Sequence, residues 1–342
     1  MLVLLIFVIG QYIAVSQMGV FMVNDAAEEF VFVVGIPVIG FIINLVIRSV
    51  QIRKIRQRYG DDSEDDVFDV KAEDIEEWNQ HNQPISGKYD ADCAVKTRTG
   101  IYVGEKQKSV MFYLGIPYAK PPIGERRWKA PCPLPSSEDV FEAKHFGASA
   151  IQVEHKGLIL KHHRQSEDCL TLNIFSGIDD TKTGKPVLVL FHHGDFTYGG
   201  SADPLLDGER MVTAHPDVMV VSFNHRLGFF GFIDFSEVPG GEDFPDALNL
   251  GLLDQIEALK WIRENIAAFG GDPNQITVMG FEDGAAAISL IAVSEKAKGL
   301  FQKAFIFVGN PISAYDTPDN ARALAKDLLS VTKRVNGGAF AA

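Results

Sequence analysis

The sequence predicts an α/β domain with a mostly parallel sheet, preceded by two transmembrane helices. Apolar runs without strict alternation, typical of strands covered on both faces, are separated by stretches whose apolar residues recur at helical spacing. The clearest transition lies at residues 276–287, where an apolar run turns through glycines into a small-residue helix. By contrast, the first 47 residues are almost wholly apolar apart from one short polar loop. Alternating strands and helices imply a mostly parallel sheet.

Residues 1–47 predict a two-helix membrane anchor. Residues 1–23 and 30–47 are apolar, and at about 1.5 Å per residue each can cross the hydrocarbon core as a helix. A signal peptide is the alternative for the first run, but no Lys or Arg precedes it. Basic residues follow the second run (Arg48, Arg53, Lys54, Arg56, Arg58), and acidic residues lie between the runs (Asp25, Glu28, Glu29). Because positive residues tend to stay inside, we expect a multi-pass membrane protein with its globular domain in the cytoplasm.

Residues 48–93 form a linker that is basic at first and then acidic. Acidic side chains predominate at residues 61–77, and such a charged run is typically a solvated tether. The net charge of −13 and the lack, outside residues 48–58, of a basic stripe interleaved with aromatics argue against nucleic acid as a partner.

The globular domain is expected at residues 94–342. Short β-rich runs at its start predict a small antiparallel sheet, at residues 94–97, 101–103 and 110–113. Buried strands are predicted at residues 170–175, 187–191, 218–223, 276–279 and 304–308, the last as an unpaired edge. Helices are predicted at residues 248–269, where apolar residues recur at helical spacing, and around residues 318–329.

Several motifs resemble those of the type-B carboxylesterase and cholinesterase-like family of α/β-hydrolases. They are Leu114-Gly-Ile-Pro-Tyr-Ala-Lys-Pro-Pro-Ile-Gly-Glu-Arg-Arg-Trp128, Ser166-Glu-Asp-Cys-Leu-Thr-Leu-Asn173, Phe223-Asn-His-Arg-Leu-Gly228, Asn249-Leu-Gly-Leu-Leu-Asp-Gln255 and Phe269-Gly-Gly-Asp-Pro273. Their order and spacing follow the family from about residue 94 to residue 330. The resemblance implies the N-terminal part of an α/β-hydrolase domain.

The resemblance also implies two structural ion pairs and a missing disulfide. Arg127 would pair with Glu167, and Arg226 with Asp254; the alternative is that these side chains bind substrate. Cys169 matches one half of a disulfide that many secreted members contain, whereas the partner position falls near Ala150. A buried, inert thiol at Cys169 agrees with a reducing compartment.

The glycine-rich turn at residues 276–287 matches the family's nucleophile position but contains no serine there. Gly280 and Gly284 occupy the two glycine positions of the Gly-x-nucleophile-x-Gly turn, and Glu282 lies between them. A carboxylate that attacked an ester would form an anhydride instead of the usual acyl-serine. Shifting the register to make Asp283 the nucleophile would put Phe281 where a small residue is needed.

The loop that corresponds to the family's oxyanion loop is also altered. The family has His-Gly-Gly-Gly-Phe, and this chain has His192-His-Gly-Asp-Phe196. Gly194 remains, Asp195 replaces a glycine, and the residue after the nucleophile position is Asp283. We therefore expect three carboxylates (Asp195, Glu282, Asp283) to crowd a site built to stabilise negative charge, which disfavours esterase chemistry.

The acid and histidine partners of the family's triad should follow the turn, but none of the nine histidines lies after Gly284. The resemblance thus predicts a serine-lacking, C-terminally truncated member. His192, His193 or His225 could supply a rewired base, although packed or solvated roles are more common for such residues. The spacing of His162, His163 and the other candidate ligands fits no zinc pattern, so we expect neither metal nor cofactor.

The leading hypothesis is a membrane-tethered carboxylesterase-like protein without serine esterase activity, acting through a protein partner as do the neuroligins and neurotactin, relatives without the serine. The first alternative is a carboxylic ester hydrolase whose active site is rewired through Glu282 or completed by another chain. The second is a truncated product without activity of its own.

The membrane topology is testable by proteolysis of intact cells. We expect protease added outside to leave residues 60–342 intact, because the basic residues after the second apolar run should hold them in the cytoplasm. Immunoblotting for the C-terminal part, with and without permeabilisation, measures this protection. Digestion without permeabilisation would place the domain on the other side.

Overall fold

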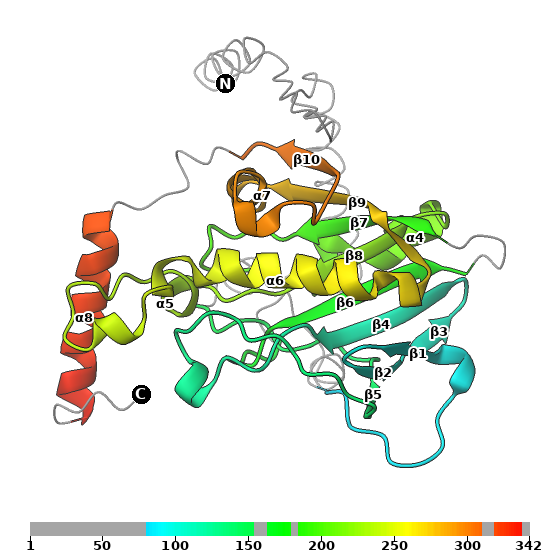
Figure 1. The fold of residues 1–342 in the computed structure, drawn as a ribbon, viewed down its shortest axis with the longest axis horizontal. Helices are drawn as coiled ribbons and strands as arrows, with labels where there is room; N and C mark the ends of the chain where they lie inside the picture. Colours follow the sequence, from blue (N-terminus) through cyan, green and yellow to red (C-terminus); the bar gives the residue numbers. More distant parts are fainter. Residues whose placement is uncertain (1–79, 154–162, 179–183, 310–317, 337–342) are drawn as a thin grey trace, which may run out of the picture.

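The computed structural model describes residues 80–153, 163–178, 184–309 and 318–336, and its centre is a seven-stranded sheet (Figure 1). The strand order is β10-β9-β7-β8-β6-β4-β3. Their bounds are β3 (Glu105–Gln107), β4 (Val110–Pro117), β6 (Thr171–Gly177), β7 (Lys185–Phe191), β8 (Met219–Phe223), β9 (Gly271–Phe281) and β10 (Lys303–Phe307). All five buried strands predicted from the sequence are present, β9 being longer than predicted.

The sheet is mixed, which corrects the prediction of a mostly parallel one. β10, β9, β7 and β8 run parallel to one another, but β6 is antiparallel to β8, β4 to β6 and β3 to β4. The apolar runs could not reveal strand direction, because a strand that is covered on both faces has the same composition whether its neighbour is parallel or antiparallel. At the far end β10 is an edge strand among the described residues, as predicted.

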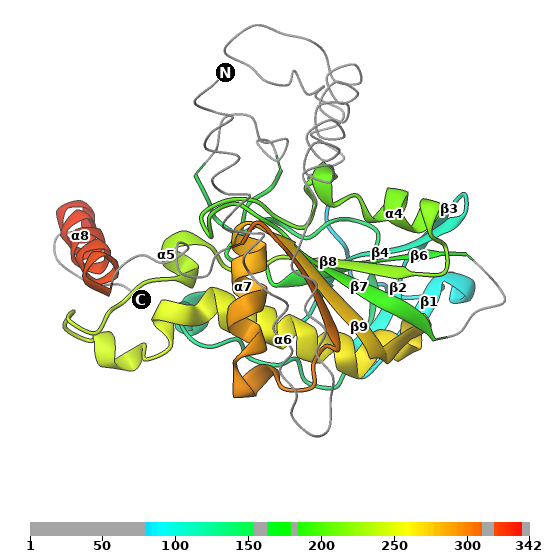
Figure 2. The ribbon, with the colours of Figure 1, turned by 90° about the horizontal axis from the view of Figure 1, so that it is seen from above.

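Helices cover both faces of the sheet. They are α4 (Gly208–Ala214), α5 (Gly228–Gly231), α6 (Leu250–Asn265), α7 (Asp283–Ala292) and α8 (Pro318–Asn336). α6 and α7 lie on one face and α4 on the other (Figures 1 and 2). Successive strand residues point to opposite faces. Val189 therefore joins the core under α6 and α7, and Leu190 joins the core under α4.

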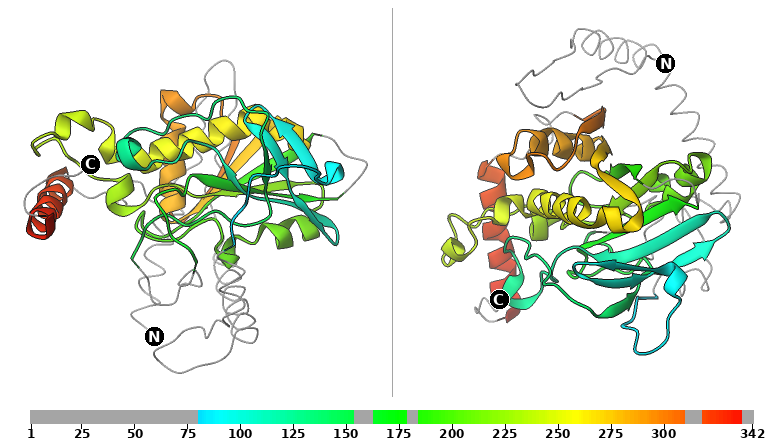
Figure 3. Two further views of the ribbon diagram at one scale, coloured as in Figure 1. Left: turned by 90° about the horizontal axis from the view of Figure 1, so that it is seen from below. Right: turned by 45° about the vertical axis from the view of Figure 1, so that its right-hand side comes forward.

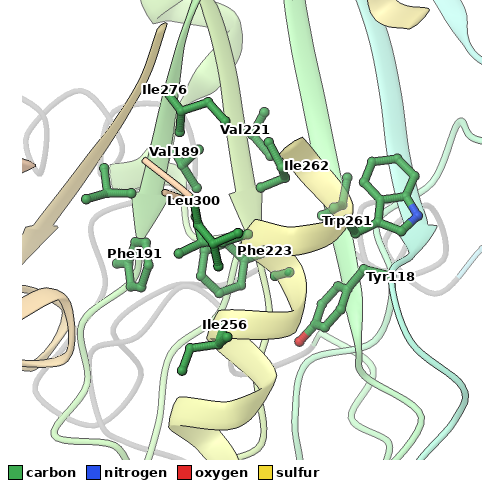
Figure 4. Close-up of a cluster of buried hydrophobic side chains, with 14 of the residues drawn as sticks. Tyr118, Val189, Phe191, Val221, Phe223, Ile256, Trp261, Ile262, Ile276 and Leu300 are labelled. Carbon is green, nitrogen blue, oxygen red and sulfur yellow. The ribbon is translucent and has the colours of Figure 1, made fainter. Parts of the chain in front are cut away.

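The larger core lies between the parallel strands and α6 (Figure 4). Ile256 and Ile262 of α6 pack against Val189 and Val221, and all four side chains are at most 4% exposed. The helical spacing of apolar residues in the sequence thus marks the face of α6 that is buried.

The small sheet at the start of the domain differs from its prediction. β1 (Ala94–Thr97) and β2 (Gly100–Val103) form the expected antiparallel hairpin, but β2 also pairs in parallel with β5 (Val140–Glu142). Residues 110–113, predicted for this sheet, belong to β4 of the main sheet, where they pair with β6. The small sheet lies beside the β3–β4 end of the main sheet (Figure 3). Which strands pair depends on contacts between residues that are far apart in the sequence, and the periodicity of apolar residues does not reveal these contacts.

α8 lies at the opposite end of the molecule, beyond α5 (Figures 1 and 2). Ala325 of α8 is fully buried in a cluster that includes Trp128 and Phe235. The two predicted transmembrane segments and most of the linker lie outside the described residues. Within the described ranges, no helix combines the length and the apolar character needed to cross a bilayer.

Candidate active site at the turn between β9 and α7

The turn between β9 and α7 holds Glu282 in a strained backbone conformation. β9 ends at Phe281 and α7 begins at Asp283, and Glu282 between them has φ 50° and ψ −116°. Residues other than glycine rarely adopt positive φ, and such strain persists only where surrounding contacts enforce it. Glu282 N donates to the carbonyl oxygen of Phe307 at 3.1 Å, and Ala286 N donates to Glu282 O at 2.9 Å. The Glu282 side chain is exposed, so the turn presents a carboxylate to solvent.

Gly280 and Gly284 make this turn possible because no side chain fits at either position. A Cβ on Gly280 would lie 2.5 Å from the carbonyl carbon of Gly284. A Cβ on Gly284 would lie 2.8 Å from the carbonyl oxygens of Phe191 and His192. These neighbours are backbone atoms and cannot move aside as the end of a flexible side chain can. The two glycines therefore bring the first turn of α7 against the end of β7, as the motif predicts.

The loop that follows β7 has an unusual backbone. Gly194 has φ 136°, and Asp195 and Phe196 have φ 52° and 55°. The N–H groups of Thr197 and Tyr198 both donate to the carbonyl oxygen of Gly194 at 2.9 Å. Two successive non-glycine residues with positive φ turn the N–H groups of Gly194 and Phe196 toward the start of α7.

The Asp283 carboxylate accepts both of these N–H groups. Oδ1 lies 2.8 Å from Gly194 N, and Oδ2 lies 3.1 Å from Phe196 N. The residue is 5% exposed, and it is the first residue of α7, where the helix dipole favours negative charge. The sequence analysis counted the Asp283 carboxylate among the crowding charges and missed that it accepts both loop N–H groups. An acidic residue directly after the nucleophile position is the signal that could have pointed to this contact.

The three carboxylates expected to crowd the site differ in their burial. Asp283 lies against the loop N–H groups, whereas Asp195 and Glu282 are exposed. Both exposed residues have a positive φ, 52° at Asp195 and 50° at Glu282. The crowding of the three charges stays a prediction; Asp283 alone of the three is buried against the loop N–H groups.

His192 and His225 form a buried stacked pair near the turn. Their ring centroids are 4.5 Å apart with an interplanar angle of 18°, and both residues are 2% exposed. His192 Nδ1 lies 3.1 Å from the carbonyl oxygen of His193, and Gln255 Nε2 lies 3.3 Å from His225 Nε2. Burial lowers the pKa of both histidines, so both rings are neutral at pH 7.

Across the described ranges, Glu282 is not hydrogen-bonded to any of the candidate bases, His192, His193 or His225. His163, one of the candidate metal ligands, instead bonds Ser149 Oγ through Nδ1 at 2.9 Å. No group of three His, Cys, Asp or Glu side chains suited to a metal occurs in the part of the chain that the structure describes, and His162 lies outside it.

Both pairs implied by the resemblance lie together in the structure. Arg127 Nε and Nη2 donate to the two oxygens of Glu167 at 2.6 and 2.7 Å. Arg226 donates to Asp254 through Nε (2.8 Å), Nη2 (2.7 Å) and its backbone N–H (3.1 Å). Asp254 is fully buried and Arg226 is 3% exposed, so removing either partner would leave an uncompensated buried charge.

Cys169 is a free and fully buried thiol, as predicted. Burial raises its pKa, which keeps the thiol protonated and unreactive. The residue is therefore a packed side chain of the core and not a candidate nucleophile.

Comparison with known proteins agrees with this geometry. The model of the carboxylesterase family matches residues 91–334. The chain is 44% identical over 218 residues to para-nitrobenzyl esterase of Bacillus subtilis, a match that covers 63% of the chain and 43% of that protein. It is 36% identical over 257 residues to cholinesterase of Mus musculus, covering 71% of the chain and 42% of that protein.

A solved structure shows the same fold. A thermophilic pNB esterase superimposes with a TM-score of 0.62 at 39% identity, covering 72% of this chain and 51% of that one. The chain spans less than half the length of the curated relatives named above.

Buried neutral histidines should make folding sensitive to acid. Burial lowers the pKa of His163 to about 4 from an unfolded value of roughly 6.5. Because the folded state favours the neutral ring, this stability is complete above pH 6.5 and is lost as pH falls toward 4. We expect the free energy of unfolding to drop by about 3 kcal/mol from His163 alone, at about 1.4 kcal/mol per pKa unit. Urea unfolding at pH 7, 5.5 and 4 measures this change.

A matched pair of variants tests whether His163 causes the loss of stability at low pH. His163→Gln should reduce the loss of stability at low pH, whereas His215→Gln, which changes an exposed histidine, should retain it. The buried His192 and His225 add to the loss in both variants, because their pKa shifts have the same sign. Equal acid sensitivity in the two variants would contradict the assignment to His163.

Proposed function

The chain belongs to the carboxylesterase family, and from that premise we propose that it keeps the family's scaffold but does not hydrolyse esters by a serine mechanism. One observation carries the proposal. The strained residue at the turn between β9 and α7, where the resemblance places the family's serine, is Glu282. The geometry of a nucleophile turn is therefore present, with a carboxylate in place of the hydroxyl.

The chemistry around Glu282 supports the proposal. Serine hydrolases need a hydroxyl, a histidine within hydrogen-bond reach and N–H donors aimed at the developing oxyanion. Glu282 supplies no hydroxyl, and the neighbouring histidines His192 and His225 are buried against each other. The N–H groups of Gly194 and Phe196, which correspond to the family's oxyanion loop, are already bonded to the Asp283 carboxylate. A negative charge at that point repels a developing oxyanion.

A second candidate is a carboxylic ester hydrolase that works through Glu282. The relatives favour it, since the chain is 44% identical over 218 residues to a para-nitrobenzyl esterase. The exposed Glu282 carboxylate would attack the ester carbonyl, form an anhydride and release the alcohol, and water would then hydrolyse the anhydride. An active site completed by another chain belongs to this candidate as well.

Turnover of short-chain aryl esters separates the two candidates. If the chain has no esterase chemistry, the full-length wild type, Glu282→Gln and the control Glu105→Gln should all hydrolyse p-nitrophenyl acetate at the rate of buffer. If Glu282 is the nucleophile, Glu282→Gln should lose about 10⁴-fold or more of the wild-type rate, and Glu105→Gln should lose none. Glu105 is exposed on β3, at the opposite edge of the sheet.

Glu282→Ser is the third variant in this assay. We expect it to stay inactive, because the Asp283 carboxylate still holds the loop N–H groups. Activity in Glu282→Ser alone would contradict this interpretation of the surrounding residues.

We also propose that the retained scaffold binds a protein partner through the edge strand β10. The support is the exposure of apolar side chains there: Phe305 on the strand is 41% exposed, and Val308 directly after it is 70% exposed. An unpaired edge with apolar side chains can pair with an added strand. The two-helix anchor at residues 1–47 stays part of this proposal, because membrane attachment would hold the domain near such a partner.

Substitution at the edge tests partner binding. Affinity purification of the full-length chain from its native cells should recover a partner that Phe305→Ser loses by roughly tenfold or more, since central aromatic residues dominate binding energy. The control is Phe229→Ser, which alters a similarly exposed phenylalanine (40%) on α5. Equal recovery with both variants would reject β10 as the site, and the absence of a partner would leave the inactive-product hypothesis.

A further inference from the structure

The loop between Gly194 and Phe196 has the geometry of an anion-binding nest. Successive backbone N–H groups that a turn points into one concavity are a recurring way to bind anions. Asp195 and Phe196 both have positive φ, at 52° and 55°, which orients the N–H groups of Gly194 and Phe196 to the same side.

Contacts outside the nest fix its shape. The carbonyl oxygen of Gly194 accepts two backbone N–H groups, and that of Phe196 accepts the N–H of Gly228 at 2.8 Å. The Phe196 ring packs on Phe232 with centroids 5.0 Å apart. Contacts with residues other than Asp283 therefore also hold the loop, and its form does not depend on that carboxylate alone.

The two oxygens of Asp283 bind the nest in the manner of a small carboxylate ligand. Each oxygen accepts one N–H, at 2.8 and 3.1 Å, and the residue is 95% buried. The start of α7 adds favourable electrostatics for a negative charge. In this chain the nest is thus filled by an internal anion.

We propose that this nest is a carboxylate-binding site that Asp283 keeps closed, and that removing this side chain opens it to a small external monocarboxylate. This carboxylate-binding site deepens the proposed function. It rests on that function in one respect, that the loop corresponds to the family's oxyanion loop. Ester turnover by the wild type would refute the proposed function and leave this site untouched. Conversely, a failure of carboxylate binding would refute this site and leave the proposed function untouched, because anion binding is measured without any turnover.

Chemical rescue tests the site in the full-length chain. Asp283→Ala keeps Cβ and removes the carboxylate, so formate, the smallest carboxylate, is the probe. We expect the midpoint of thermal unfolding of Asp283→Ala to rise by about 2–4 °C, in a saturable way, when sodium formate replaces sodium chloride at equal ionic strength. The wild type should show no such shift, because its nest is occupied.

The matched control is Asp272→Ala, which removes another carboxylate that accepts hydrogen bonds from a backbone N–H (Asn274) and a side-chain amide (Gln275). Asp272→Ala should show no formate shift, because its carboxylate does not lie in a nest at a helix start. Equal shifts in all three proteins, or none in folded Asp283→Ala, would overturn the inference.

A second measurement applies even if Asp283→Ala does not fold. Amide hydrogen exchange in the wild type should be slow at both Gly194 and Phe196, because their N–H groups are bonded to the carboxylate. Asp283→Asn keeps the shape but replaces one acceptor by an NH₂ donor, and at least one of the two amides should then exchange about tenfold faster or more. Fast exchange of both amides in the wild type, or unchanged exchange in Asp283→Asn, would overturn the inference.

Discussion

The close approach of α7 to the ends of β7 and β9 is the constraint on which the rest of the site depends. Gly280 and Gly284 allow it, since a side chain at either position would collide with backbone atoms. The approach forces Glu282 into a positive φ and places Asp283 beside the loop after β7. The exposed carboxylate and the buried one are therefore two consequences of a single packing contact.

The electrostatics of the site follow from that contact. N–H groups and a helix start that could stabilise an external negative charge are instead satisfied by the charge of Asp283. The buried histidines His192 and His225 are stacked and neutral, as burial lowers the pKa of both. At this turn, the scaffold shared with the esterase relatives thus holds a carboxylate that occupies the loop N–H groups, together with two buried, neutral histidines.

Much of the fold could be predicted because its determinants are local. The apolar runs locate the strands, the spacing of Ile256, Ile262 and their neighbours locates α6, and Gly280 and Gly284 locate the turn. The pairing of β4 with β6, and the antiparallel direction of three strand pairings, could not be predicted in the same way. Strand partners are chosen by contacts between residues distant in the sequence, and composition carries little information about them.

For the site, the sequence by itself determined which residue occupies the turn and which glycines permit it, because a Gly-x-Glu-x-Gly pattern after an apolar run is a local property of the chain. Only the tertiary structure decided what the neighbouring carboxylate binds. Asp283 meets Gly194 and Phe196 across 89 and 87 residues, after β7 and β9 have been brought side by side in the sheet. The position of a donor relative to an acceptor at such separation depends on register and backbone angles, which arise only when the strands and α7 pack together.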